Sequence, residues 1–246
     1  MTESSPEIVL YDLACTKNVC FSPAVLRTRL MLNYKHVAYE TIFLEFPDIE
    51  QTLKELGVAP HDTRSDSEPR YTVPAIHHVP SSTYLMDSHA IAEFLESTYP
   101  TPPLTLVSSF INQVSCKARS ALGPAFRSSV TPREIRILPP RSQVYFRQKR
   151  EALLGHRLED LLDLDREERT WNDLADEIRA AGEFMLTNKA NGPFVLGAQP
   201  SYTDFFIAGS LHSARMVDEG IFERCTKFPG YKEIYEACRP YMDKMD

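Results

Sequence analysis

The sequence predicts an α/β domain at the N-terminus followed by an all-helical domain at the C-terminus. Over residues 8–99, short runs of β-branched and aromatic residues alternate with segments of helical periodicity. A stiff, proline-rich segment, Tyr99 to Leu104, follows them. Beyond it the patterns are almost wholly helical. We therefore assign residues 1–99 to the α/β domain, 100–107 to a linker and 108–246 to the helical domain.

Composition narrows the class of protein. With 246 residues, 43% hydrophobic and 25% charged, the chain can bury a core in each of two soluble domains. A net charge of -7 argues against nucleic acid or an anionic membrane as the main partner. The N-terminus lacks the features of a signal peptide, and no stretch is apolar enough to span a bilayer. We therefore expect a cytoplasmic protein.

Five scattered cysteines give no sign of a disulfide framework or a metal site. They form no C-x-x-C pair, and no histidines cluster with them in the spacing of a zinc site. Reduced thiols and the absence of a bound metal are expected.

The first strand and helix frame a candidate anion site. Ile8 to Tyr11 is an apolar run that predicts a strand, and Ser22-Pro23 predicts the cap and first residue of a helix. A hydroxyl among the unpaired N–H groups of a first turn can hold a phosphate, a carboxylate or a thiolate. The simpler interpretation is that Ser22 only caps the helix.

The next segments predict a βα unit and a long insertion. Tyr39 to Phe46 has strand character and should run parallel to the first strand, because a helical crossover joins them. Pro47 to Leu56 is predicted to be a short helix. Gly57 to Arg70 is polar and rich in turn formers, which predicts a long loop or hairpin. It is either a lid over a site or a surface insertion.

A β-hairpin is predicted next, with Tyr71 to Ile76 and Thr83 to Met86 as its strands. Pro74 cannot donate to a ladder, so it should lie at an open strand edge, after a cis peptide bond. Val73 would then offer its N–H and C=O to an extended peptide lying alongside.

Asp87-Ser88 precedes a third helix, predicted from Ala90 to Tyr99, and Ser88 resembles its N-cap. Capping alone explains the pair. Alternatively, Ser88 and the first N–H groups hold a carboxylate while Asp87 pairs with an ammonium group. That combination fits the α-amino-acid end of a peptide.

The C-terminal half offers mainly structural signals. Ser201 to Asp204 is a capping box, with Asp in place of the usual Glu or Gln. The basic segment 133–150 and the acidic run 159–168 are interpreted as solvated faces, although the arginines could hold an anionic ligand. One apolar helical face is predicted from the spacing of Trp171, Leu174, Ala175, Ile178 and Met185.

Taken together, these elements resemble the thioredoxin-like plan, and the whole chain resembles the cytosolic glutathione transferases. Ser22 to Leu30 is similar to the start of the omega class, with serine where that class has cysteine. Val73-Pro74, Asp87-Ser88 and Gly197 to Asp204 are similar to the other markers of the family. The fungal-specific class A enzymes, related to the bacterial β-etherases, are the most similar class at three segments: Leu10 to Leu13, the loop before Ser22, and Leu85 to Leu95. The lid hairpin of that class resembles residues 57–70.

The resemblance implies a transferase that detoxifies aromatic compounds, with glutathione as co-substrate and Ser22 as the donor that stabilises its thiolate. Etherase or peroxidase activity is a variant of this chemistry, and a ligandin that mainly sequesters phenolic compounds is the alternative. A homodimer is implied. The implied glutathione contacts are Val73, Pro74, Asp87, Ser88, Lys17, Asn18, Tyr71 and Thr72. The implied second-substrate pocket contains Ala14, Phe126 and Tyr145. If Cys20 reached the sulfur, a mixed-disulfide reductase would become possible.

Overall fold

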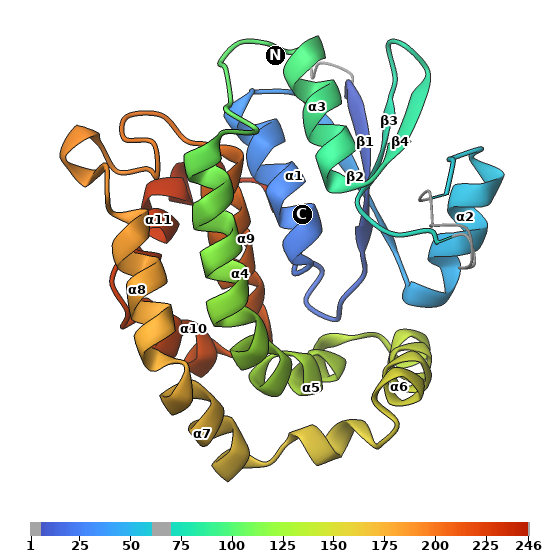
Figure 1. The fold of residues 1–246 in the computed structure, drawn as a ribbon. Coiled ribbons are helices and arrows are strands. Elements are labelled where there is room, and N and C mark those ends of the chain that lie inside the picture. Colours follow the sequence, from blue (N-terminus) through green and yellow to red (C-terminus); the bar gives the residue numbers. More distant parts are fainter. Residues whose placement is uncertain (1–5, 61–69, 246) are drawn as a thin grey trace.

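A computed structural model describes residues 6–60 and 70–245, so most of the insertion predicted at residues 57–70 lies outside the described residues. The N-terminal domain is a four-stranded sheet in the order β2-β1-β3-β4 (Figure 1). β1 pairs with β2 in parallel and with β3 antiparallel, and β3 and β4 form a hairpin, as predicted. Its elements are β1 (Ile8–Leu13), α1 (Pro23–Tyr34), β2 (Tyr39–Leu44), α2 (Ile49–Glu55), β3 (Ala75–His78), β4 (Thr83–Met86) and α3 (Ser88–Thr98).

β1 is one of the two inner strands of the sheet and is buried along its whole length. Because side chains alternate between faces, Ile8 and Leu10 pack toward α1, α3 and the helical domain. Val9, Tyr11 and Leu13 pack on the opposite side, in the core shared with α2 and with α6 (Pro140–Leu154). This strand therefore connects the two cores of the molecule, and its C-terminal end lies where the domains meet.

Several boundaries in this domain differ from the predicted ones; the helix predicted from Pro47 to Leu56, for example, is shorter and spans Ile49–Glu55. β3 begins at Ala75 instead of Tyr71 because Pro74 has no N–H for the ladder, and the Val73–Pro74 bond is cis, as predicted. β2 ends at Leu44, since a 3₁₀ turn begins at Phe46. α3 begins two residues early, at Ser88.

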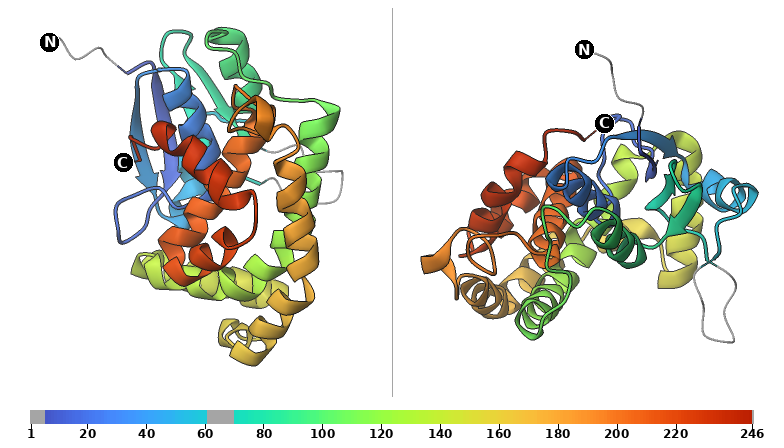
Figure 2. Two further views of the ribbon diagram at one scale, coloured as in Figure 1. Left: turned by 90° about the vertical axis from the view of Figure 1, so that its left-hand side faces the viewer. Right: turned by 90° about the horizontal axis from the view of Figure 1, so that it is seen from above.

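The helical domain wraps around α9, which packs on α1, α4, α10 and α11 (Figures 1 and 2). α6 lies apart from this bundle and contacts the 3₁₀ turn before α2. Of the helices in the described ranges, none combines the length and the apolar character needed to cross a bilayer. The elements are α4 (Ser109–Ser129), α5 (Thr131–Glu134), α6 (Pro140–Leu154), α7 (Leu164–Asp173), α8 (Ala175–Met185), α9 (Tyr202–Val217), α10 (Glu219–Thr226) and α11 (Tyr231–Cys238).

The apolar face predicted around Trp171 belongs to two helices, α7 and α8, which meet at Leu174. Leu174 keeps near-helical backbone angles, with φ -93° and ψ -4°. The apolar spacing therefore continues across the joint, and periodicity alone could not show the break. Trp171, Ile178 and Met185 are buried as the pattern predicts.

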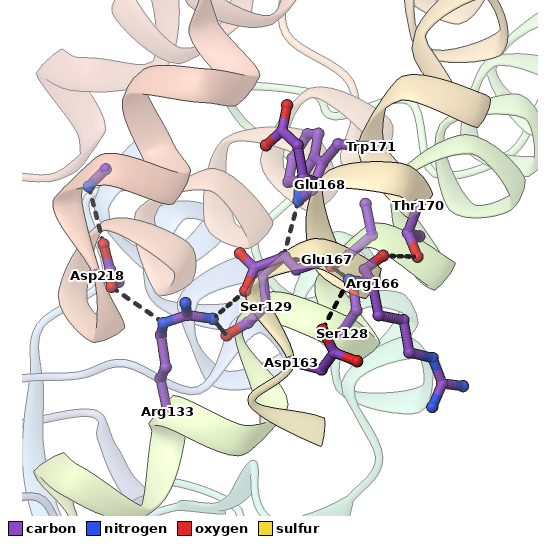
Figure 3. A network of polar contacts seen from close by, with 12 residues as sticks. Ser128, Ser129, Arg133, Asp163, Arg166, Glu167, Glu168, Thr170, Trp171 and Asp218 are labelled. Carbon is purple, nitrogen blue, oxygen red and sulfur yellow. Dashed lines mark hydrogen bonds and ion pairs between the residues drawn. The ribbon is translucent and has the colours of Figure 1, made fainter. Parts of the chain in front are cut away.

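The charged segments of this domain pair with each other, so the interpretation as solvated faces is wrong for part of them. Arg147 Nη2 lies 2.6 Å from Glu159 Oε1 at the partly exposed surface. Arg133 Nη1 lies 2.9 Å from Glu167 Oε2, and both of these side chains are largely buried (Figure 3). Ion pairs between segments distant in the sequence cannot be recognised from charge runs.

The predicted capping box at the start of α9 is confirmed. Ser201 Oγ accepts from the backbone N–H of Asp204, and Asp204 Oδ2 accepts from the backbone N–H of Ser201 at 2.8 Å. Asp204 Oδ2 also accepts from Ser201 Oγ at 2.6 Å, and its other oxygen accepts from the N–H of Val195 at 2.8 Å. All these groups are buried, so the carboxylate fixes both the start of α9 and the preceding loop.

We expect Asp204→Asn to lower the free energy of unfolding by about 2 kcal/mol, because the amide turns an N–H group toward the buried N–H of Ser201. Chemical denaturation measures the change. Asp173→Asn, the same substitution at an exposed carboxylate, should change stability by less than about 0.5 kcal/mol. Equal effects at the two positions would contradict the role assigned to Asp204.

Candidate functional site

A cavity of about 540 Å³ lies where the two domains meet, within the usual size of small-molecule sites. The end of β1, the start of α1, the turn before α2 and the segment before β3 form its N-terminal wall. α5 and α6 form the opposite wall. The cavity brings together five residues that the sequence singled out: Ser22, Tyr71, Thr72, Val73 and Tyr145.

Ser22 occupies the N-cap position of α1, and the helix begins at Pro23 as predicted. Its carbonyl accepts from the N–H of Leu26 at 2.8 Å, which closes the first helical turn. Its side chain makes no cap hydrogen bond. The simpler interpretation, in which the hydroxyl only caps the helix, is therefore wrong. The hydroxyl lies at the positive end of a 12-residue helix and lines the cavity.

Val73 presents an unpaired backbone edge to the same cavity. It precedes the cis bond to Pro74 and lies outside the β3 ladder, which begins at Ala75. Within residues 6–60 and 70–245, no hydrogen bond to the N–H or C=O of Val73 is formed. This is the arrangement that an extended peptide needs in order to add to a strand edge.

The start of α3 differs from the prediction, because Asp87 and not Ser88 is the N-cap. Asp87 Oδ1 accepts from the N–H groups of His89 and Ala90 at 2.8 and 3.2 Å. The backbone of Asp87 has a positive φ of 81°, which is uncommon for a residue other than glycine and is found more often at functional sites. Asp87 lines a separate cavity of about 320 Å³ on the β4 side of α3.

Ser88 lies in the first turn of α3, next to a partly buried cation. Arg27 Nη2 donates to Ser88 Oγ at 3.1 Å, and the Arg27 guanidinium is held over the rings of Tyr202 and Phe206. A serine hydroxyl can accept such a bond and still donate its own hydrogen. Ser88 can therefore donate to a carboxylate in the field of a positive charge.

Two family models match the chain. The N-terminal domain of glutathione S-transferases matches residues 21–98, and the C-terminal domain of glutathione S-transferases matches residues 110–226. A glutathione S-transferase-like protein of Aspergillus flavus, ustS, is 30% identical over 235 residues, which cover 88% of this chain and 83% of the relative. The chain belongs to the glutathione transferase family.

Solved structures agree with this assignment. Glutathione transferase GSTFuA3 of Phanerochaete chrysosporium is similar with a TM-score of 0.82 at 27% identity, covering 98% of this chain and 99% of its own. CsGST63524 of Ceriporiopsis subvermispora, solved in complex with glutathione, has a TM-score of 0.81 at 29% identity, covering 97% and 99%. The predicted fold, a thioredoxin-like domain followed by a helical domain, is confirmed.

Several predicted contact residues of this glutathione transferase lie outside the cavity that contains Ser22. Lys17 Nζ donates to the carbonyl of Met216 at 2.6 Å, and Asn18 is exposed with a positive φ. Ala14 donates its N–H to Leu44, in line with the β1–β2 ladder. Phe126 lines a different cavity, of about 190 Å³, between α4 and α9. These residues were chosen from sequence position and type, neither of which shows where a side chain points.

Cys20 does not have the character of a reactive thiol. It is fully buried, and burial together with the nearby Asp12 carboxylate raises the pKa of its thiol well above the ordinary value. A thiol attacks a disulfide as its thiolate, which this environment opposes. The structure therefore gives no support to a mixed-disulfide reductase based on Cys20.

The sequence analysis suggested that arginines of segment 133–150 could hold an anionic ligand, but it did not place that segment at this cavity and it missed Glu134. Glu134 from α5 and Lys149 and Arg150 from α6 line the cavity opposite Ser22. Burial raises the pKa of Glu134 to about 7, against the lowering effect of Arg150. Glu134 is the only acidic residue in the basic segment 133–150, and that contrast is the one sequence signal for it.

Proposed function

We propose that this protein is a glutathione transferase of the fungal-specific class A type, acting on aromatic electrophiles or ethers in detoxification. The observation that supports the proposal most directly is the position of the Ser22 hydroxyl, which makes no cap hydrogen bond and lies at the N-terminus of α1. Ser22 lines the same cavity as Val73, whose backbone N–H and C=O form no hydrogen bond within the described residues. By family resemblance we place the protein in the cytoplasm, as a homodimer.

Glutathione would bind in an extended conformation across the N-terminal domain. The cysteinyl backbone would pair with the N–H and C=O of Val73, which brings the sulfur to Ser22. The γ-glutamyl carboxylate would accept from Ser88, whose hydroxyl is already polarised by Arg27 at 3.1 Å. The γ-glutamyl ammonium would lie near the Asp87 carboxylate. Two relatives solved in complex with glutathione support this ligand.

The reaction requires the thiolate of glutathione, because the thiolate and not the thiol is the nucleophile. The Ser22 hydroxyl would donate a hydrogen bond to the sulfur, and the N-terminus of α1 would add a favourable field. One hydrogen bond to a charged partner contributes about 1.5–3 kcal/mol, which equals a fall of about 1–2 units in the pKa of the thiol. Ser22 is a donor here and neither a base nor a nucleophile.

A ligandin is the second candidate function, and the aromatic lining of the cavity favours it. Flat phenolic ligands stack well on such walls whether or not they react. In a ligandin the glutathione site is retained, but bound aromatic compounds are released unchanged. The aromatic lining residues are Phe21, Phe46, Tyr71 and Tyr145.

Calorimetric titration with glutathione tests the proposal, using Asp87→Asn. Asparagine keeps an oxygen that can cap α3 and tolerates a positive φ, but it loses the charge that would pair with the ammonium group. We expect the affinity for glutathione to fall about 10- to 100-fold.

Asp163→Asn is the matched control, since Asp163 caps α7 through the N–H of Arg166, away from the cavity. Its affinity for glutathione should equal that of the wild type. A wild-type protein that binds no glutathione would contradict the proposal. An affinity unchanged in Asp87→Asn would remove Asp87 from the site.

A further inference from the structure

Glu134 places a carboxyl group in the proposed reaction cavity, and the proposed function gives this group no role. Glu134 is the last residue of α5 and lines the same cavity as Ser22. The side chain of Glu134 forms no hydrogen bond or ion pair within the described part of the chain. A partly buried carboxyl without a partner is unusual, because burial normally demands compensation for the lost water.

The backbone that carries Glu134 is held firmly by its neighbour. Arg133 donates to the carbonyl of Ser129 at 2.7 Å and forms ion pairs with Glu167 at 2.9 Å and Asp218 at 3.3 Å (Figure 3). These contacts join α5 to α4, α7 and the start of α10. Successive residues of a helix point about 100° apart, so fixing Arg133 on one side directs Glu134 to another.

The charges around the Glu134 carboxyl are mixed. α6 contributes Lys149 and Arg150 to the cavity wall, and α2 contributes Glu50, which is paired with Lys54 at 2.6 Å. Arg70, before β3, lines the cavity and is exposed. The nearby Arg150 favours the carboxylate, but burial outweighs it and raises the pKa of Glu134 to about 7. Both protonation states are therefore populated at neutral pH, the condition that suits a group exchanging a proton with a substrate.

Addition of the thiolate to some substrates requires a proton donor, and Ser22, which donates its hydrogen bond to the sulfur, does not supply that proton. When the sulfur attacks an epoxide, an electron pair moves onto the oxygen, and the resulting alkoxide must take up a proton. When it displaces a halide from an aromatic ring, the leaving chloride needs none. An acid in the cavity therefore helps only the first kind of substrate.

Building on the proposed function, we propose that Glu134 is the general acid for an aromatic substrate that carries an epoxide. Glu134 delivers its proton to the epoxide oxygen while the glutathione thiolate attacks a carbon of the epoxide. The S–C bond forms, the C–O bond breaks, and the oxygen receives both the electron pair and the proton of the carboxyl group. The Glu134 carboxylate then takes up the proton that the next glutathione thiol releases on ionising. One glutathione and one epoxide give one thioether alcohol.

The test compares styrene oxide with chlorodinitrobenzene as substrates of wild type and Glu134→Gln. The amide fills the same space and can donate a hydrogen bond, but it cannot give up a proton. We expect kcat/KM for styrene oxide to fall about 100-fold, as for the loss of a general acid, and kcat/KM for chlorodinitrobenzene to change by less than about threefold. Glu50→Gln, which removes the other carboxylate at this cavity, should leave the ratio of the two values unchanged.

The pH dependence gives a second readout. The protonated form of Glu134 is the active acid, so the ratio of epoxide to halide conjugation should fall about tenfold from about pH 6 to about pH 8 in the wild type. Taking the ratio removes the pH dependence of the thiolate, which both reactions share. In Glu134→Gln the ratio should be independent of pH.

The outcomes separate the two proposals. A wild type that conjugates chlorodinitrobenzene but not styrene oxide, or a ratio unchanged in Glu134→Gln, overturns the role of Glu134 and leaves the transferase intact. A wild type that binds no glutathione and conjugates neither substrate overturns the proposed function, and the role of Glu134 with it.

Discussion

Replacing Ser22 with alanine is expected to lower kcat/KM for glutathione conjugation to chlorodinitrobenzene about 10- to 100-fold, because a rise of about 1–2 units in the pKa of the bound thiol lowers the thiolate fraction by that factor. The hydroxyl makes no cap hydrogen bond in the structure. Its removal should therefore change stability by less than about 0.5 kcal/mol, so the loss of turnover cannot be attributed to unfolding.

Titration of the bound thiol shows whether the loss has the proposed cause. Ultraviolet absorbance of the thiolate in the glutathione complex gives its pKa directly, and Ser22→Ala should raise that pKa by about 1–2 units. Ser22→Thr keeps a hydroxyl and should stay near the wild-type value. Lost turnover with an unchanged thiol pKa would show that Ser22 acts on another step.

Turnover, and not dye binding, separates the transferase from the ligandin. Binding of an aromatic dye to the cavity should survive in Ser22→Ala under either function, because the dye would contact the aromatic walls. If wild-type turnover is already negligible while the dye binds tightly, the ligandin is favoured.

The N-terminal fold could be predicted because its signals are local. A Ser-Pro pair sets where a helix starts, and Pro74 sets where a ladder cannot run, whatever the rest of the chain does. The choice of cap at α3 could not be predicted, because Asp87 and Ser88 are both good N-cap residues and adjacent in sequence. The structure decides between them, because the Asp87 carboxylate accepts from the N–H groups of His89 and Ala90.

Only the part of the site that local sequence signals define could be predicted. Ser22 and Val73 reach the cavity through elements that the sequence pattern defines, whereas Glu134 reaches it because α5 and α6 fold back over the N-terminal domain. Nothing in the spacing of a basic segment tells which side chain faces inward. Phe126 lines another cavity, between α4 and α9, and aromatic character alone does not tell which cavity a side chain lines.

The most heavily buried ion pair of the molecule's described part was also invisible in the sequence. Asp12 lies on β1 among apolar residues, on the face toward α1, where Arg29 Nε and Nη2 donate to its Oδ2 at 3.1 and 3.0 Å. Both side chains are 0% exposed. The pair joins the strand that ends at the cavity to the helix that begins there, and so fixes the position of Ser22 relative to β1.

We expect Asp12→Ala to lower the free energy of unfolding by about 3–5 kcal/mol, because it removes the carboxylate that accepts two hydrogen bonds from the fully buried Arg29 guanidinium. The cost arises from the lost charge pairing inside the protein, so adding Arg29→Met to Asp12→Ala should recover a large part of the loss. Denaturation of the wild type, both single variants and the double variant measures this coupling. If the double variant were instead as unstable as the sum of the single variants, the pair would contribute through packing alone, and the charge on Asp12 would have no part in holding α1 against β1.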